Sequence, residues 1–84
     1  MRYAAKVDAN HREVIDALRA CGWKIISTAA LGSFVDCVGQ RAGVTRLIEI
    51  KTPTGKLRPS QAKLLAEGWD VRIVRSVADA ARLQ

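Results

Sequence analysis

Aromatic residues, cysteine and histidine are scarce in this chain of 84 residues, which holds one Phe, one Tyr, two Trp, two Cys and one His. Cys21 and Cys37 are too few and too isolated for a zinc site, and each is expected to be a small buried residue in a reducing compartment. The single histidine, His11, has no nucleophile or base to work with in the sequence, so catalysis by it is not expected. No apolar run is long enough to cross a bilayer and no signal-peptide pattern is present, which favours a cytoplasmic protein without a membrane role.

The remaining composition is that of a folded domain. Apolar residues make up 49% of the chain, which is normal for a globular protein. Frequent alanine and few aromatics favour small helices that cover a modest sheet. Internal repeats, linkers and low-complexity segments are absent from the sequence, so residues 1–84 are expected to form a single domain.

Positive charge predominates. Lys and Arg number 14 against 8 acidic residues, which gives a net charge of +6. This balance favours a polyanionic partner, with nucleic acid first. The basic residues are dispersed along the chain, so any basic surface must be assembled by the fold. Charge alone is also compatible with a generically basic soluble protein.

Hydrophobic periodicity and turn residues predict seven elements in the order α-β-β-β-α-β-α. Residues 1–7 could be a frayed arm or a short edge extension. Asp8 or Asn10 is the expected N-cap of the first helix, and Asn10 with Glu13 has the spacing of a capping box. The ranges are helices at 9–21, 59–68 and 76–83, and strands at 23–28, 34–40, 44–51 and 69–75. A helical crossover before the last strand predicts that it lies parallel to the third, giving a mixed α/β (α+β) fold with a four-stranded sheet.

The segment from Phe34 to Lys51 is predicted to be a hairpin whose strands carry unexpected charges. If Ala42 and Gly43 form the tip of the turn, residues whose numbers sum to 85 are opposite each other. Asp36 then faces Glu49, and Phe34 faces Lys51. Opposed side chains are roughly 5 Å apart at Cβ, where two like charges destabilise the pair. A shared proton or a bound cation must offset this repulsion.

A divalent metal is the favoured partner of the two carboxylates. Mg²⁺ and Mn²⁺ prefer oxygen ligands, and Asp36, Glu49 and the main-chain carbonyl of Ile50 would supply three. Lys51 lies on the same strand face as Glu49 and would orient the attacking water and offset charge on the phosphate. The alternative is a surface salt-bridge lattice, which is disfavoured because Phe34, Val38 and Leu47 are expected to share that face and to bury it in part.

Taken together, these features resemble the PD-(D/E)XK nuclease superfamily, and most closely its small VRR-type domains of phages and bacteria. The matching residues are Asn10 and Glu13, Gly32 ahead of Phe34-Val35-Asp36, Glu49-Ile50-Lys51, and Ser60-Gln61. The resemblance implies a restriction-endonuclease-like core and a metal-dependent endonuclease with a Mg²⁺ or Mn²⁺ cofactor. Its DNA substrate would be branched, flapped or a four-way (Holliday) junction. Val35 replaces the usual proline before the aspartate, and Arg58 stands where Ser or Thr often precedes Pro59.

Residues beside the motif complete the predicted site. Glu13 would reach a second metal or position the first through water, and the resemblance favours this role over the alternative, a capping-box carboxylate for Asn10. The resemblance also places Gln61 near the attacking water and Lys51. Lys56, Arg58 and, with a solvated charge as the alternative, Arg12 are candidate phosphate contacts. We expect a homodimer, because one small basic protomer covers little duplex and a two-fold pair presents two sites. A catalytically silent nucleic-acid-binding module and an RNA-directed nuclease are the rival interpretations.

Overall fold

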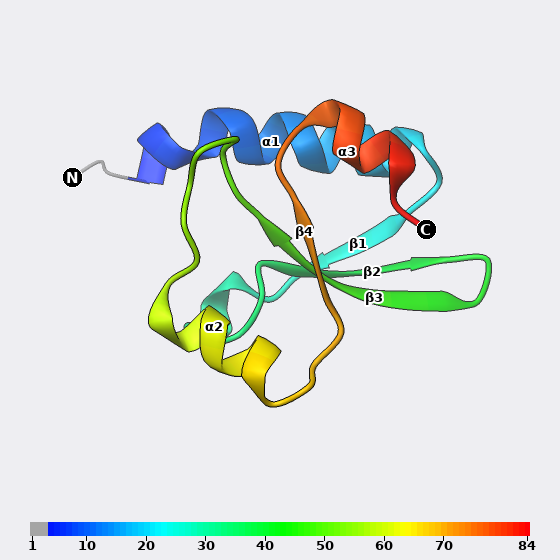
Figure 1. Cartoon of the computed structure of the whole chain (residues 1–84). Coiled ribbons are helices and arrows are strands. Elements are labelled where there is room, and N and C mark those ends of the chain that lie inside the picture. The colour runs from blue at the N-terminus through cyan, green and yellow to red at the C-terminus, as the bar shows by residue number, and fades with distance from the viewer. Residues whose placement is uncertain (1–3) are drawn as a thin grey trace.

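The computed structural model describes residues 4–84, with side chains described from residue 10 onward. The elements follow the predicted α-β-β-β-α-β-α order, with one added 3₁₀ turn (Figure 1). The helices are α1 (Ala4–Ala20), η1 (Ala29–Leu31), α2 (Pro59–Ala66) and α3 (Val77–Arg82). The strands are β1 (Lys24–Ser27), β2 (Cys37–Arg41), β3 (Val44–Ile50) and β4 (Val71–Val74). The predicted mixed α/β fold is therefore confirmed. No helix in the described part of the chain is long and apolar enough to cross a membrane.

The four strands form one mixed sheet in the order β1-β2-β3-β4. β1 and β3 are antiparallel to β2, and β4 is parallel to β3 as predicted. Cys37 pairs with Ile48 and Arg41 with Val44, so the expected hairpin register is correct. Ala42 and Gly43 both have positive φ (52° and 82°), the backbone that a two-residue turn of the I′ type requires.

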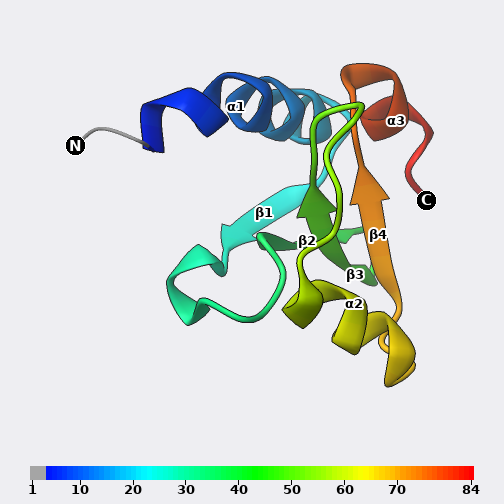
Figure 2. The same cartoon turned by 60° about the vertical axis from the view of Figure 1, so that its left-hand side comes forward.

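The helices lie on both faces of the sheet. α1 and α3 cover one face, and α2 lies on the other (Figures 1 and 2). The core lies between the two helices α1 and α3 and the sheet. Its buried apolar residues are Val14, Leu18, Trp23, Cys37, Ile48, Ile50, Val74, Ala80 and Leu83. The second face is covered only in part, because α2 is short. The end of β3 thus lies between the α1–α3 layer on one face and the short α2 on the other. The candidate site is at this end of β3.

The first helix begins earlier than predicted. α1 starts at Ala4, so Asn10 is inside the helix and the predicted cap at Asp8 or Asn10 is wrong. Alanine and lysine favour helix enough for these residues to continue it. The Asn10 side chain is instead used in a tertiary contact, donating from Nδ2 to the main-chain oxygen of Lys51 at 3.1 Å. Residues 4–7 are helical rather than an arm or edge extension, and Met1–Tyr3 lie outside the described residues.

The predicted second strand also begins too early, because residues 34–36 are not in the sheet. The Thr28 N–H donates to the Asp36 main-chain oxygen at 2.9 Å, and the Thr28 hydroxyl donates to the Val35 oxygen at 2.6 Å. These bonds keep the segment ahead of β2 in an irregular path. The pairing of Phe34 with Lys51 therefore lies outside the ladder. Cys37 is buried as expected, whereas Cys21 is only half-buried.

Candidate metal and nucleic-acid site

Asp36 and Glu49 meet at the end of the hairpin, one position beyond the Cys37–Ile48 pair. Asp36 Oδ2 accepts a hydrogen bond from the Ile50 N–H at 2.8 Å, so a carboxylate occupies the place of a ladder carbonyl. Burial, followed by the neighbouring Asp36, raises the pKa of Glu49 above its usual value. Burial and the same two carboxylates raise the pKa of the Cys37 thiol to about 12, so this thiol stays protonated and is a poor metal ligand.

The two oxygens of Glu49 have different surroundings. The side chain is 2% exposed. Its Oε2 atom is 3.4 Å from Lys51 Nζ and also accepts a hydrogen bond from Gln61 Nε2. Its Oε1 atom is buried and has no hydrogen-bond partner among the described residues. An unpartnered buried carboxylate oxygen is costly, so either a proton shared with Asp36 or a bound cation is needed to satisfy it.

Gln61 links α2 to the carboxylate. Pro59 begins α2, and Arg58 precedes it with extended backbone (φ −77°, ψ 160°). Gln61 Oε1 accepts from the Arg58 N–H at 2.9 Å, which caps the helix and leaves Gln61 Nε2 directed at Glu49. The arginine side chain has no acceptor, so the reciprocal capping bond is missing. Gln61 is itself buried, with 4% exposure.

The main-chain carbonyl of Ile50 is on the same side of β3 as Asp36. In a strand, the N–H and C=O of one residue point toward the same edge, and the Ile50 N–H bonds Asp36 Oδ2. The described residues contain no cluster of three or more His, Cys, Asp or Glu side chains. The site instead offers two carboxylates and one carbonyl, a hard oxygen set that suits Mg²⁺ or Mn²⁺. The unpartnered Glu49 oxygen fits such an ion.

A cavity of about 320 Å³ opens beside these groups. Its lining comes from α1, the end of the hairpin and the loop before α2: Asn10, His11, Asp36, Glu49, Ile50, Lys51, Thr52 and Arg58. The two acidic side chains are balanced by Lys51 and Arg58. The Lys51 side chain is 14% exposed, and its ammonium is adjacent to the buried glutamate. One cleft therefore offers a carboxylate pair for a metal ion and two cationic side chains for a phosphate.

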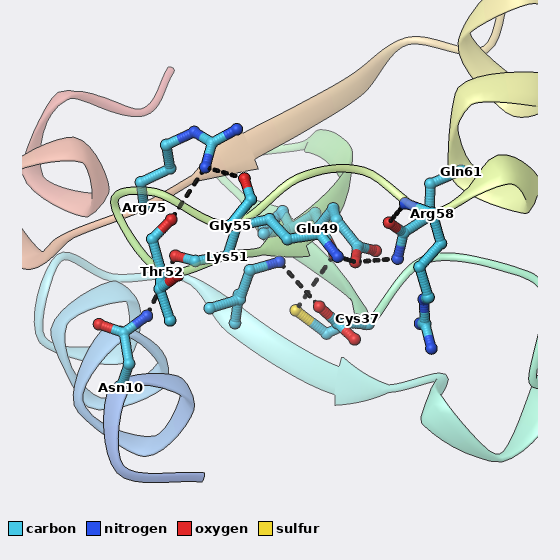
Figure 3. Close-up of polar contacts among 12 residues, drawn as sticks. Asn10, Cys37, Glu49, Lys51, Thr52, Gly55, Arg58, Gln61 and Arg75 are labelled. Carbon is cyan, nitrogen blue, oxygen red and sulfur yellow. Dashed lines mark hydrogen bonds and ion pairs between the residues drawn. The ribbon is translucent and has the colours of Figure 1, made fainter. Parts of the chain in front are cut away.

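The loop from Thr52 to Arg58 is fixed by a residue that sequence reasoning missed. Arg75, directly after β4, donates from Nη1 to the main-chain oxygens of Thr52 at 2.8 Å and Gly55 at 2.6 Å (Figure 3). A Cβ on Gly55 would lie 2.9 Å from Thr52 Oγ1, so a larger residue there would require the Thr52 side chain to shift. No local pattern identifies Arg75, because it is 20 and 23 residues from its partners along the chain.

The remaining predicted residues are spread around the cleft. Arg58 lines it, whereas Lys56 is exposed on the loop outside the cavity lining. Glu13 is exposed on α1 and does not line the cleft, where Asn10 and His11 lie instead. Arg12 is exposed and lines a separate hollow along α1. Asp36, Glu49, Ile50, Lys51 and Gln61 are thus brought together, and the roles of Glu13 and Lys56 stay predictions.

Comparisons with protein-family models, with curated proteins and with solved structures each returned no match. Functional inference for this chain therefore depends on its own residues and their geometry.

Proposed function

We propose that the protein is a divalent-metal-dependent endonuclease that hydrolyses DNA phosphodiester bonds, as the PD-(D/E)XK and VRR-type resemblance suggests. The observation that carries the proposal is the buried, unpartnered Oε1 of Glu49, next to Asp36 in an open cleft. Two neighbouring carboxylates that are both ionised need a cation to offset their repulsion. Asp36, Glu49 and the Ile50 carbonyl would hold Mg²⁺ or Mn²⁺.

Such an ion, when bound, lowers the pKa of water and stabilises charge on a phosphate. The protein's own groups have distinct tasks around it. Lys51 and Gln61 both contact Oε2 of Glu49, which fixes the carboxylate and leaves Oε1 available. The Lys51 ammonium would also hold the attacking water and offset negative charge that develops on the phosphate. Arg58 would contact a phosphate at the edge of the cleft.

The main alternative is a catalytically silent nucleic-acid-binding module. In that case a proton shared between Asp36 and Glu49 would relieve their repulsion in place of a metal, and the raised pKa of Glu49 favours protonation. The two hypotheses differ in metal affinity. A bound ion would displace the proton and would favour the ionised form of both carboxylates.

We further propose that the substrate is branched or flapped DNA, including four-way junctions, and that the active form is a homodimer. β1 is an edge strand, and Ile26 on β1 and Leu31 on η1 are 71% and 64% exposed. Exposed apolar side chains beside an unpaired strand edge are suited to contact with a second copy. A two-fold pair would present two clefts to the two strands of a branched substrate.

Calorimetric titration with Mn²⁺ tests the metal. Wild type is expected to bind Mn²⁺ with release of protons, and Asp36→Asn and Glu49→Gln should each weaken binding by about tenfold or more because each removes one charged ligand. Glu67→Gln, which changes an exposed glutamate at the end of α2 that does not line the cleft, should leave binding unchanged. A folded wild type that binds no Mn²⁺ would favour the silent module.

Cleavage assays with Lys51→Ala test catalysis. Labelled duplex, single strand, flap, four-way junction and RNA would be incubated with Mg²⁺, Mn²⁺ or EDTA. We expect metal-dependent cleavage of branched DNA by wild type, and a loss of about 10²–10³-fold in kcat for Lys51→Ala with metal and DNA binding retained. Equal activity in that variant would make Lys51 structural. Preferential cutting of RNA would instead favour the RNA-directed nuclease.

A further inference from the structure

A second hollow, of about 440 Å³, runs along the outer face of α1. It is lined by His11, Arg12, Ile15, Asp16 and Arg19. Residues 12, 15, 16 and 19 are three or four positions apart, so they form one helix face. Val14 and Leu18 on the opposite face are fully buried in the core. The hollow therefore lies on the outward side of α1, with Arg12 and Arg19 exposed.

His11 joins the hollow to the cleft. It lines the cavity that holds Asp36 and Glu49, and it also lines the hollow of Arg12 and Arg19. A chain that leaves the cleft past His11 thus enters a surface bearing two arginines. These arginines are seven residues apart, or about 10 Å along the helix axis. That length corresponds to about three steps of one DNA strand at 3.4 Å per step.

The cleft by itself has little net attraction for a polyanion. Its lining carries two acidic side chains, Asp36 and Glu49, and two basic ones, Lys51 and Arg58. When no metal ion is bound, as in EDTA, most of the affinity for a phosphate backbone is therefore expected from charges outside the cleft. The α1 hollow lies directly against the cleft and contributes two guanidinium groups against one carboxylate, that of Asp16.

We propose that this face of α1 is a backbone track that holds one arm of the DNA substrate, with Arg12 and Arg19 on phosphates about three steps apart beyond the cleft. The proposal rests on the proposed nuclease function and extends it from the site of cutting to the path of the substrate. Asp16, between the two arginines, limits the affinity of the track by repelling phosphate. The contacts are to backbone only, so they carry no sequence preference.

Salt-dependent binding of a labelled duplex in EDTA, where cleavage is prevented, tests the track. Arg12→Gln and Arg19→Gln should each reduce the slope of log affinity against log salt by about 0.9, and the double variant by about 1.8. Each should weaken binding about fivefold to tenfold near 0.1 M salt. Asp16→Asn should tighten binding. Substitutions at these exposed positions are expected to leave stability within about 0.5 kcal/mol.

Lys63→Gln is the matched control, because Lys63 is an exposed cation on α2, across the sheet from α1. If the arginine variants lose no more affinity or salt slope than this control, the track is refuted. In Mn²⁺ cleavage assays, the double arginine variant should raise KM and leave kcat unchanged. A wild type that binds through Arg12 and Arg19 but does not cut would refute the nuclease and keep the track.

Discussion

At the scale of single residues, Glu49 is a carboxylate whose ionisation the fold opposes. Its side chain is buried beside Asp36, and burial and that carboxylate raise its native pKa above the value of 4.5 expected in an unfolded chain. The folded state therefore binds more protons than the unfolded state between these two pKa values. Stability then falls as pH rises from about 4.5 through the native pKa, and stays reduced above it.

Glu49→Gln removes this ionisation and should stabilise the metal-free protein at neutral pH. The gain is expected to shrink as pH falls through the raised pKa and to vanish below about 4.5, where wild-type Glu49 is protonated in both states. Urea unfolding in EDTA at a series of pH values across this range measures the gain in unfolding free energy. Mn²⁺ should then stabilise wild type more than the variant. A gain that is independent of pH would contradict the ionisation account, and Glu67→Gln serves as the exposed control.

At the scale of elements, the site depends on how the segments before and after β3 are held. Asn10 of α1 bonds the Lys51 main chain, and Arg75 after β4 bonds the loop at Thr52 and Gly55. The Arg75 N–H in turn donates to Asp79 Oδ2 of α3 at 3.0 Å. The chain after β3 is thereby tied to α1 and to the end of β4, which is itself bonded to α3.

Arg75→Lys should loosen this loop while keeping the charge, because an ammonium lacks the planar donors of a guanidinium. We expect a loss of about 1 kcal/mol in unfolding free energy and faster amide exchange at Gly55, whose N–H donates to the Thr52 oxygen. DNA cleavage should fall because Lys51 and Arg58 flank the loop. Arg82→Lys, which alters an exposed arginine paired with Asp79, is the control. Unchanged Gly55 exchange in Arg75→Lys would show that the loop is fixed without it.

At the scale of the whole molecule, the two faces of the sheet are unequally covered. The face toward α1 and α3 holds the buried core, whereas Ile26 on the other face is mostly exposed at the β1 edge. A second copy against this edge would bury apolar surface that the 84-residue chain cannot cover by itself. The same contact would fix the spacing of two clefts on a branched DNA.

Ile26→Lys is expected to shift a wild-type dimer to monomer in sedimentation velocity measurements. Stability of the protomer should change little, because Ile26 is 71% exposed. Mn²⁺ binding per protomer should be retained, and cleavage of four-way junctions should fall more than cleavage of flaps. Val77→Lys, at a 45% exposed position on α3, is the matched substitution. A wild type that is monomeric at the concentrations used for cleavage would refute the dimer.

The sequence by itself determined the element order, the hairpin register and the neighbouring positions of Asp36 and Glu49. These follow from local causes: alternation along strands, helix periodicity, and a turn at Ala42 and Gly43 that allows one register. The predicted helix start failed because the polar side chain of Asn10 resembles a cap, whereas its partner is the Lys51 carbonyl. Local pattern could not distinguish these two uses.

Only the tertiary structure decided which groups surround the carboxylate pair. It buried Gln61 against one oxygen of Glu49, left the other oxygen without a partner, and placed Arg75 on the loop. It also placed Glu13 outside the cleft and joined the cleft to the α1 hollow through His11. The Gln61 and Arg75 contacts each join segments that are separated along the chain. Their geometry depends on how α1 and α2 pack against opposite faces of the sheet, which no local periodicity encodes.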